Sequence, residues 1–355
     1  MIVFFFDRRL GMSNSCRIGA DIQMHTRTVT KYKKINRVWM KRISLVFMFV
    51  ALTITSLMVG ADKNVTFHNL IKLDGKAWHI FFASRAPRTI AIILTASGLS
   101  IAGLIMQAIS RNKFMAPSTS GTIDAAMLGV LLSYILLGKQ PHIIQMLFGF
   151  VFAFCSTILF MMILNRIRLR DAVYVPLVGM MYGGIISAFT TAIAYHFEAL
   201  QTLSLISFGT FNRFTDFHLL YIIMIPLVLS VIYATSFSIA GMGEDFSKGL
   251  GLNYKKVTFL GLCIIAVISA ASFVTVGPIP FVGLIIPNMM TAFYGDNVSK
   301  SIFDVAVLGA SFVLLCDIFS RLIIYPYEIA VGFTIGVIGG LIFLIILVWR
   351  IKYGK

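Results

Sequence analysis

Long apolar stretches separated by short polar ones run along most of the sequence. A helix needs about 20 predominantly apolar residues to cross a bilayer, and ten stretches approach or exceed that length. The pattern therefore predicts an all-α polytopic membrane protein with about ten transmembrane helices. We expect these helices at residues 43–60, 89–109, 121–138, 141–164, 172–195, 218–240, 256–275, 279–294, 302–323 and 329–349.

The composition supports this class of protein. Of the 355 residues, 58% are hydrophobic and only 12% are charged, and the mean hydropathy is +0.90. We expect one transmembrane domain over residues 40–355 and no separate soluble domain. Residues 1–39 contain no long apolar run followed by a small-residue cleavage site, unlike a signal peptide. We expect this segment to be a disordered extension or the product of an upstream start codon, with Met40 as the true start.

The net charge of +16 could also indicate a nucleic-acid-binding protein. Such proteins, however, cluster their basic residues on one folded face. Here the basic residues follow the loops between apolar stretches. With the N-terminus in the cytoplasm, 22 of the 30 Lys and Arg residues fall in cytoplasmic regions. The positive-inside rule therefore predicts that both termini are cytoplasmic, and we expect no nucleic-acid partner.

Motifs for catalysis and metal binding are missing from the sequence. There is no GxxxxGK[ST] phosphate-binding loop and no HExxH zinc motif. The four cysteines lie too far apart to indicate a zinc site or a disulfide framework; they are Cys16, Cys155, Cys263 and Cys316. We therefore expect no cofactor, no metal site and no ATPase or protease activity in this chain, which leaves transport or conduction.

One apolar stretch, TVGPIPFVGLIIPN at 275–288, is interrupted by residues that break or kink helices. These residues are Gly277, Pro278, Pro280, Gly283 and Pro287. At membrane depth, irregular backbone is tolerated only where protein or a water-filled cavity surrounds it. We expect a broken turn that packs against other helices, with Gly283 allowing one of them to approach closely.

Two short motifs recur at an offset of 180 residues. GLIMQ at 103–107 matches GLIIP at 283–287, and DAAMLG at 124–129 matches DVAVLG at 304–309. The matches indicate an internal duplication, a common plan among transporters; chance similarity in an apolar sequence is the alternative. Asp124, although a carboxylate within an apolar stretch, is expected to cap a helix N-terminus, and Asp304 is expected to do the same in the second repeat.

Four stretches in order resemble the signatures of the FecCD-type permeases, the membrane subunits of ABC importers for ferric siderophores, haem and vitamin B12. RAPRTIAIILTASGLSIAGLIMQAISRNKFMAP (85–117) resembles RxPR…GxxxQ…NPLAxP, and GEDFSKGLGLN (243–253) resembles GExxAxxLG. GPIPFVGLIIPN (277–288) resembles GxIxFVGLxxPH, and LLCDIFSRLIIYPYEIAVG (314–332) resembles LLADxxARxxxxPxELPVG. The sequence of residues 112–129 most resembles the branch that serves catecholate-type siderophores.

Three positions depart from the family pattern. Asn288 replaces the usual His, Ala330 replaces the usual Pro, and Lys248 stands where Arg is common. None of these changes removes a charge that the expected mechanism needs. They therefore leave the predicted class of transporter unchanged and make only the subfamily assignment less specific.

The resemblance implies a permease subunit in the bacterial plasma (inner) membrane that imports a ferric siderophore by alternating access. Its implied partners are a separate ATPase subunit, an extracytoplasmic binding protein and a second permease, either a copy or a paralogue. Import of vitamin B12 or haem is one alternative. An ion-coupled secondary transporter is another, but its usual midplane carboxylates are lacking, since Asp124 and Asp317 both lie towards helix ends. A channel would need a polar ring, which the sequence lacks.

The loop at 241–255 begins with acidic residues and ends with glycine, which predicts a short helix. A helix that only closes the loop is the simpler interpretation. By resemblance, it is the coupling helix that docks into the ATPase subunit. The residues implied in this contact are Gly243, Glu244, Asp245, Lys248, Leu250 and Gly251.

Arg85, Arg88 and Arg321 lie near predicted outer helix ends. Arginines there commonly anchor a helix at the membrane interface. By resemblance, these three receive acidic side chains of the binding protein, because the planar guanidinium binds a carboxylate through two hydrogen bonds. Asp317 lies four residues before Arg321, so an ion pair within the helix competes for that arginine.

The fifth predicted helix is rich in small residues, which allow close helix packing. By resemblance, this helix lines the translocation pathway between two permease subunits, and its cytoplasmic end forms a gate. Both interpretations hold together if the pathway runs along a subunit interface. The residues assigned to the pathway and gate are Arg170, Asp171, Ala172, Gly179, Gly183 and Gly283.

Overall fold

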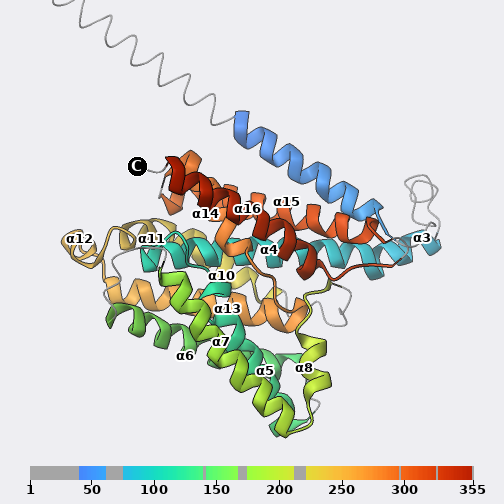
Figure 1. The fold of residues 1–355 in the computed structure, drawn as a ribbon. Helices are drawn as coiled ribbons and strands as arrows, with labels where there is room; N and C mark the ends of the chain where they lie inside the picture. The colour runs from blue at the N-terminus through green and yellow to red at the C-terminus, as the bar shows by residue number, and fades with distance from the viewer. Residues whose placement is uncertain are drawn as a thin grey trace, which may run out of the picture. The chain divides into compact units, whose positions relative to one another are not determined.

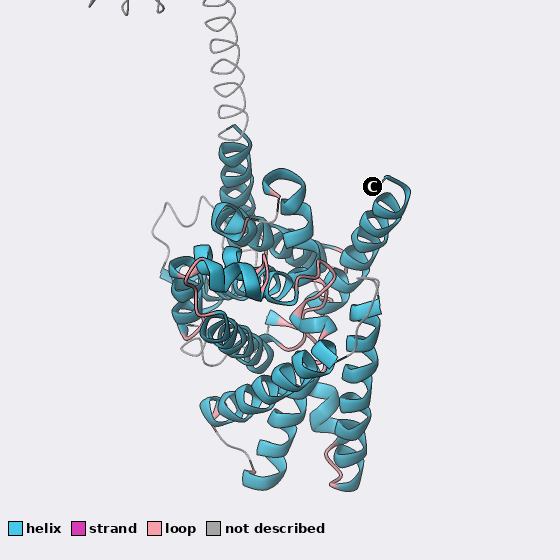
Figure 2. Cartoon of the chain, turned by 90° about the vertical axis from the view of Figure 1, so that its left-hand side faces the viewer, coloured by secondary structure: helices cyan, strands magenta, loops and turns pink. Residues whose placement is uncertain are grey.

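A computed structural model describes residues 40–60, 75–138, 141–166, 174–211, 221–295, 297–324 and 327–353. The chain divides into two compact units, Met1–Met48 and Phe49–Lys355. In the described part of both units the regular structure is helical, with no strand (Figure 2). This confirms the all-α class that the apolar pattern predicts.

After a first helix, Met40–Met58, the described helices follow in chain order, as Figure 1 shows. They are α3 (Gly75–Ile80), the π-helical turn η1 (Phe81–Arg85), α4 (Ala86–Ser110), the 3-10 turn η2 (Pro117–Thr119), α5 (Thr122–Leu137), α6 (His142–Arg166), α7 (Tyr174–His196), α8 (Leu200–Ile206), α10 (Met224–Ile232), α11 (Ala234–Ala240), α12 (Glu244–Gly249), α13 (Tyr254–Val276), α14 (Val282–Tyr294), α15 (Val298–Leu322) and α16 (Val331–Tyr353).

Seven helices of the described residues are long and apolar enough to cross a membrane. Two more of the predicted segments form shorter apolar helices, α5 and the first part of α14. The predicted segment 218–240 is interrupted, because α10 ends at Ile232 and α11 begins at Ala234. The seven long candidates are Met40–Met58, Trp78–Ser110, His142–Leu164, Tyr174–His196, Tyr254–Val276, Val298–Leu322 and Val331–Val348.

Helix α4 lies at the centre of the second unit. The span Trp78–Ser110 contains α4, and 83% of its most apolar stretch is buried. The corresponding buried share is 28% for the span of α6 and 22% for those of α7 and α16. Helices α13, α14 and α15 pack directly against α4. A helix that is apolar on all sides is stable where other helices surround it, so α4 forms the core of the unit.

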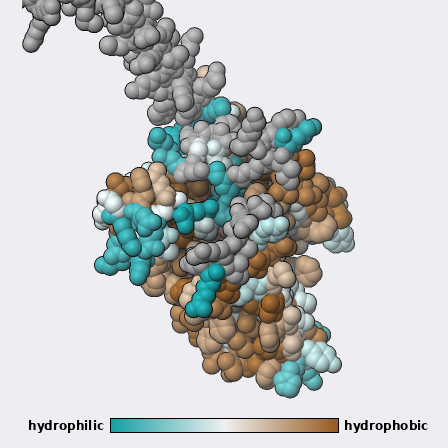
Figure 3. Space-filling view, turned by 60° about the vertical axis from the view of Figure 1, so that its left-hand side comes forward, coloured by the Kyte–Doolittle hydropathy of each residue, from teal (hydrophilic) through white to brown (hydrophobic). Residues whose placement is uncertain are grey.

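The exposed surface of the second unit is largely apolar. Leu, Ile, Phe and Met side chains of α6, α7 and α16 lie open on its outside. Figure 3 shows apolar side chains over a broad part of one face, with polar ones gathered in patches. In water such a surface would mark an interaction site; on membrane-spanning helices it faces lipid or another subunit.

Helices α4 and α14 cross at two glycines that belong to the repeated GLI motifs. A β-carbon added at Gly103 would overlap the carbonyl of Gly283, and one added at Gly283 would lie 2.8 Å from the carbonyl oxygen of Leu99. Pro287 has no N–H to donate to the carbonyl of Gly283. The crossing therefore depends on the absence of side chains at both positions, as expected for Gly283.

The interrupted stretch at 277–281 lies between α13 and α14 and packs against protein, as predicted. Gly277 takes a φ of 91° at the end of α13, and a side chain there would lie 2.9 Å from the carbonyl oxygen of Phe208. The N–H of Thr210 donates to the carbonyl of Val276 at 2.8 Å. Neighbouring segments thus supply the contacts and hydrogen bonds that a non-helical backbone needs in an apolar environment.

Neither aspartate occupies the N-cap position that we expected for it. Asp124 lies in the first turn of α5, although the N-cap itself is Gly121. Asp304 lies in the second turn of α15 and is buried, and the cap of that helix is Asn297, whose side chain accepts a hydrogen bond from the N–H of Lys300. The prediction that Asp304 caps its helix is wrong because α15 begins earlier than the apolar pattern suggests.

Candidate functional site

Two groups of candidate residues lie at opposite ends of α4. With 25 residues, α4 is about 37 Å long. Arg85 and Arg88 lie at its N-terminal end, and α12 lies beyond its C-terminal end. Figure 1 shows α3, which precedes Arg85, and α12 at opposite ends of the second unit.

The helix that carries the two arginines extends further towards the N-terminus than predicted. Helix α3, the π turn η1 and α4 are continuous from Gly75, so both arginines lie within a helix and not at its entrance. In η1 the N–H of Ala86 donates to the carbonyl of Phe81. Such a π turn changes the local hydrogen-bond pattern, and Pro87 follows it directly. Proline, typical of a helix start, therefore occurs here inside a longer helix.

Arg88 binds two carboxylates of the same chain. Its Nη2 donates to Asp317 Oδ1 at 2.7 Å, and its Nη1 donates to Glu328 Oε2 at 2.8 Å. The Asp317 side chain is fully buried, and that of Glu328 is 20% exposed. A buried charge is stable only when it is paired, so this contact fixes α15 and the segment before α16 against α4.

Arg321 and Arg85 bind the end of the first helix. Arg321 pairs with Asp317 one turn earlier, which confirms the ion pair predicted from the i,i+4 spacing. Its Nη1 also donates to the carbonyl of Val59 at 2.6 Å. The Arg85 Nη1 donates to the carbonyl of Met58 at 2.6 Å. The last carbonyls of a helix have no hydrogen-bond donors within it. Here the two guanidinium groups act as those donors.

The three arginines, Asp317 and Glu328 form an arginine cluster that joins three parts of the chain. Arg85 and Arg321 are only 6% and 5% exposed. Their guanidinium groups are directed to partners of this chain, and Glu328 is the more accessible carboxylate of the cluster. A role in docking a binding protein stays a prediction, and an acidic partner would have to compete with these contacts.

At the other end of α4, residues 243–251 form the predicted short helix and its glycine turn. Gly243 precedes α12 with a φ of 113°, and Gly251 follows it with a φ of 77°. Both values lie where glycine is favoured over other residues. The Ser247 hydroxyl donates to the carbonyl of Ile239 at 3.1 Å, which holds α12 against the end of α11.

The exposed side of α12 carries an ion pair. Lys248 Nζ lies 2.9 Å from Glu244 Oε1 across one helical turn. The hydrogen bond from Lys248, together with its charge, lowers the pKa of Glu244, and the same contact raises the pKa of Lys248. A surface pair of this kind contributes little to stability.

Three large apolar side chains also lie exposed around α12, and sequence reasoning missed two of them. Met242, Phe246 and Leu250 are 63%, 52% and 60% exposed. They are spaced four residues apart in the sequence; Phe246 lies within α12, and Met242 and Leu250 flank its two ends. That spacing is visible in the sequence, but we assigned the loop from its charges and glycines.

Of the predicted pathway and gate residues, the gate residues Arg170, Asp171 and Ala172 lie outside the described residues. A β-carbon at Gly179 would overlap the carbonyl of Thr119, and one at Gly183 would lie 2.6 Å from Asp124 Oδ2. These two glycines therefore pack α7 against η2 and α5 within the chain. A role in the pathway stays a prediction.

Two polar residues of the quoted motifs bind the carbonyl of Leu284. The Gln107 amide of α4 donates to it at 3.3 Å, and the Asn288 amide donates to it at 2.7 Å. Asn288 also donates to the carbonyl of Lys113 at 2.6 Å. The asparagine that replaces the usual histidine thus ties α14 to the loop that follows α4.

The family pattern of the FecCD transport family matches residues 47–349. The chain belongs to the FecCD transport family. Among its FecCD relatives, the petrobactin import system permease protein YclN of Bacillus subtilis is 43% identical over 316 residues, covering 88% of this chain and 100% of YclN. The ferric-anguibactin transport system permease protein FatD of Vibrio anguillarum is 37% identical over 302 residues, covering 84% of this chain and 96% of FatD.

The fold of this FecCD chain is similar to that of a solved structure, an inward-facing conformation of a metal-chelate type ABC transporter. The TM-score is 0.72 at 20% sequence identity, over 86% of this chain and 98% of the other. The family and the apolar spans identify the chain as a multi-pass permease of the bacterial plasma membrane. As a FecCD permease, it is a transport subunit.

Proposed function

We propose that this chain is the permease subunit of an ABC importer that moves a ferric siderophore across the plasma membrane by alternating access. The observation that carries the proposal is the match, over nearly their whole length, to permeases named for petrobactin and ferric anguibactin. These relatives differ in organism but are all named for siderophore uptake. The same importer class, with vitamin B12 or haem as substrate, is the alternative.

A separate ATPase subunit is the partner that α12 would bind. Exposed Met242, Phe246 and Leu250 form an apolar stripe, and the Glu244–Lys248 pair lies on the same short helix. Apolar anchors with a polar rim are typical of protein interfaces. The stripe therefore suits a groove in a soluble protein, and the ATP-driven step would come from that partner.

The remaining partners are a second permease subunit, a copy or a paralogue, and an extracytoplasmic binding protein. The largely exposed face of α7 suits the second permease, with the pathway beside Gly179, Gly183 and Gly283. The arginine cluster suits the binding protein, whose acidic side chains would compete with Glu328 for Arg88. Exchange of one carboxylate for another keeps the guanidinium paired throughout docking.

The topology that we propose has ten membrane segments with both termini in the cytoplasm. It adds α5, α14 and the interrupted α10–α11 segment to the seven long helices. In this orientation the arginine cluster lies outside and α12 lies in the cytoplasm. Each proposed partner then meets the surface to which its chemistry is suited.

Uptake of radiolabelled iron in a strain that lacks this chain tests the proposed function. Iron is supplied as several defined siderophore chelates, and cobalamin and haem uptake are measured in parallel. We expect uptake of one chelate class to be lost and to return when the chain is restored together with its ATPase. Normal chelate uptake with loss of cobalamin or haem uptake would favour the alternative substrates, and no defect in any of these would contradict the proposal.

A further inference from the structure

Arg111 ends α4 in a backbone conformation that favours glycine. Its φ of 50° and ψ of 34° are left-handed, and its N–H donates to the carbonyls of Ala108 and Gln107. Glycine is the usual residue at such a helix end, because a β-carbon is unfavourable there. A strained residue of this kind points to a role for the side chain, since the backbone would be more stable with glycine.

The Arg111 side chain lies against the first turn of α12. Its Nη1 lies 3.0 Å from the position that a β-carbon on Gly243 would take. Gly243 is buried, with a φ of 113°, so a side chain at that position would strain the backbone and would displace the exposed Arg111 side chain. The last residue of the central helix thus contacts the residue that begins the short exposed helix.

The backbone supports the same connection. A β-carbon on Gly241, between α11 and α12, would lie 3.5 Å from the carbonyl oxygen of Ala108 in the last turn of α4. Ser247 anchors α12 to α11 through the carbonyls of Ile239 and Gly243. The bond from Ser247 to Ile239 ties α12 to α11, and the turn between these two helices meets the end of α4 at Ala108 and Arg111.

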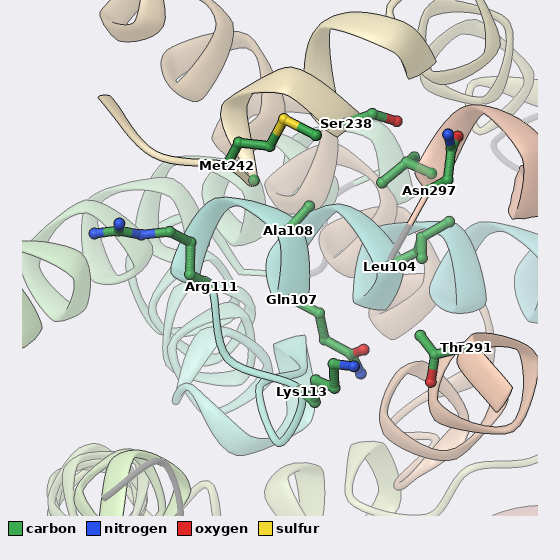
Figure 4. Close-up of a pocket in the computed structure, with 11 residues that line it drawn as sticks. Leu104, Gln107, Ala108, Arg111, Lys113, Ser238, Met242, Thr291 and Asn297 are labelled. Carbon is green, nitrogen blue, oxygen red and sulfur yellow. The ribbon is translucent and has the colours of Figure 1, made fainter. Parts of the chain in front are cut away.

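A cavity of about 510 Å³ adjoins this contact. Leu104, Gln107, Ala108 and Arg111 of α4 line one side, and Ser238 and Met242 are among the residues opposite. Figure 4 shows Arg111 extending away from Asn297 and Thr291, on the side where Met242 lies. Close-packed interiors resist displacement, whereas this open space adjoins Gly241 and Met242 in the turn before α12 and leaves that turn room to shift. Arg111 can keep contact with α12 during such a shift.

We propose that Arg111 is a positioning residue that transmits movement between α12 and the central helix α4. This inference rests on the proposed function, in which α12 receives movement from the ATPase subunit. The guanidinium lies against Gly243 at the N-terminal end of α12, so a displacement of α12 towards Arg111 pushes on the end of α4. Helix α4 then carries that displacement to its other end, where the arginine cluster lies.

Replacement of Arg111 by glycine separates this role from that of a helix cap. Arg111→Gly keeps the favoured backbone and removes only the side chain, so thermal stability should be equal or higher. Arg111→Lys keeps the charge and part of the reach. Glu198→Gly is the matched control, because Glu198 is an exposed residue with a φ of 53° after α7, remote in sequence from α12. Each variant is reconstituted in liposomes with its ATPase and binding protein.

The measured quantity is the amount of ferric siderophore transported per ATP hydrolysed. We expect Arg111→Gly to retain the ATPase subunit but to transport between about twofold and thirtyfold less per ATP, the range of coupling changes seen for residues between sites. Arg111→Lys should recover part of that loss, and Glu198→Gly should match the wild type. Normal transport per ATP in Arg111→Gly would overturn the role of Arg111 alone. A wild-type chain that binds no ATPase subunit would overturn the proposed function as well.

Discussion

At the scale of single residues, Asp317 holds the arginine cluster together. Its two carboxylate oxygens bind Arg88 and Arg321, and its side chain is fully buried. Removing one member of a buried charge group leaves the others without compensation, which costs about 3–5 kcal/mol. The cluster is therefore more sensitive to loss of this one negative charge than to most surface changes.

We expect Asp317→Asn to lower the midpoint of thermal unfolding in detergent and to reduce the amount of chain found in membranes, because two buried guanidinium groups lose their shared anion. Glu198→Gln, which also replaces a carboxylate by an amide but at an exposed position, should leave both quantities unchanged. Equal midpoints for the two variants would show that water or another group can replace the carboxylate.

The sequence could predict only the local part of this cluster. The Asp317–Arg321 pair follows from a spacing of four residues. The bond from Arg88 to Asp317 joins positions 229 residues apart, and the bond from Arg88 to Glu328 joins positions 240 apart. Spacing carries no information on such contacts, because they depend on how α15 packs against α4. A resemblance to family motifs places these residues within the motif stretches without showing that they touch.

At the scale of helices, α12 and its glycine turn can be tested by two neighbouring glycines. Gly249 and Gly251 both have open space around the position of a β-carbon. Only Gly251 has a positive φ, of 77°, so only there does a side chain strain the backbone. Comparing substitutions at the two sites therefore distinguishes the effect of backbone strain from the effect of adding a side chain.

Substitution of Gly251 by Val should distort the turn after α12 and reduce co-purification of the ATPase subunit, since Leu250 and Phe246 would no longer be held in the same geometry. Gly249→Val is the matched change without a positive φ and should retain most of the ATPase subunit. The ratio of ATPase to permease after affinity purification measures both. If the two variants retain equal amounts, the turn is not needed for α12 to bind its partner.

Helix boundaries were predicted less well than the presence of helices, for physical reasons. The apolar pattern placed the start of the second helix at residue 89, but the helix continues towards the N-terminus through Pro87 and the π turn at Phe81–Arg85. The mostly apolar 218–240 segment gave no sign of an interruption at Tyr233, since its one proline, Pro226, lies within α10. The interruption at 277–281, by contrast, was predictable, because glycine and proline lack the side chain or the N–H that a regular helix needs.

At the scale of the whole molecule, hydropathy predicts which segments are apolar but not which are central. Helix α4 is mostly buried, whereas α6, α7 and α16 are mostly exposed, although all four are strongly apolar. Lipid and protein interior are similarly apolar, so the same side chains suit both. Small residues such as Gly103 mark the central helix better, because they permit the close crossings on which the core depends.

The orientation of the chain follows from how many segments cross the membrane. An odd number, such as the seven long helices alone, would place the termini on opposite sides, whereas the proposed ten place both in the cytoplasm. The cavity in Figure 4 favours the latter, since it joins Arg111 and Lys113 to Ser238 and Asn297. These residues lie in or next to three loops that the positive-inside rule assigns to one side, with Ser238 in the last turn of α11.

Reporter fusions decide between these topologies. Alkaline phosphatase needs disulfides that form only outside the cytoplasm, so a fusion after Lys355 should be inactive and a fusion after Gly138 should be active. A green fluorescent protein at the same positions should give the reverse, which controls for differences in expression. An active phosphatase after Lys355 would contradict the ten-segment topology, because the basic C-terminal end would then lie outside. It would also place α12 and the arginine cluster on sides that do not suit their proposed partners.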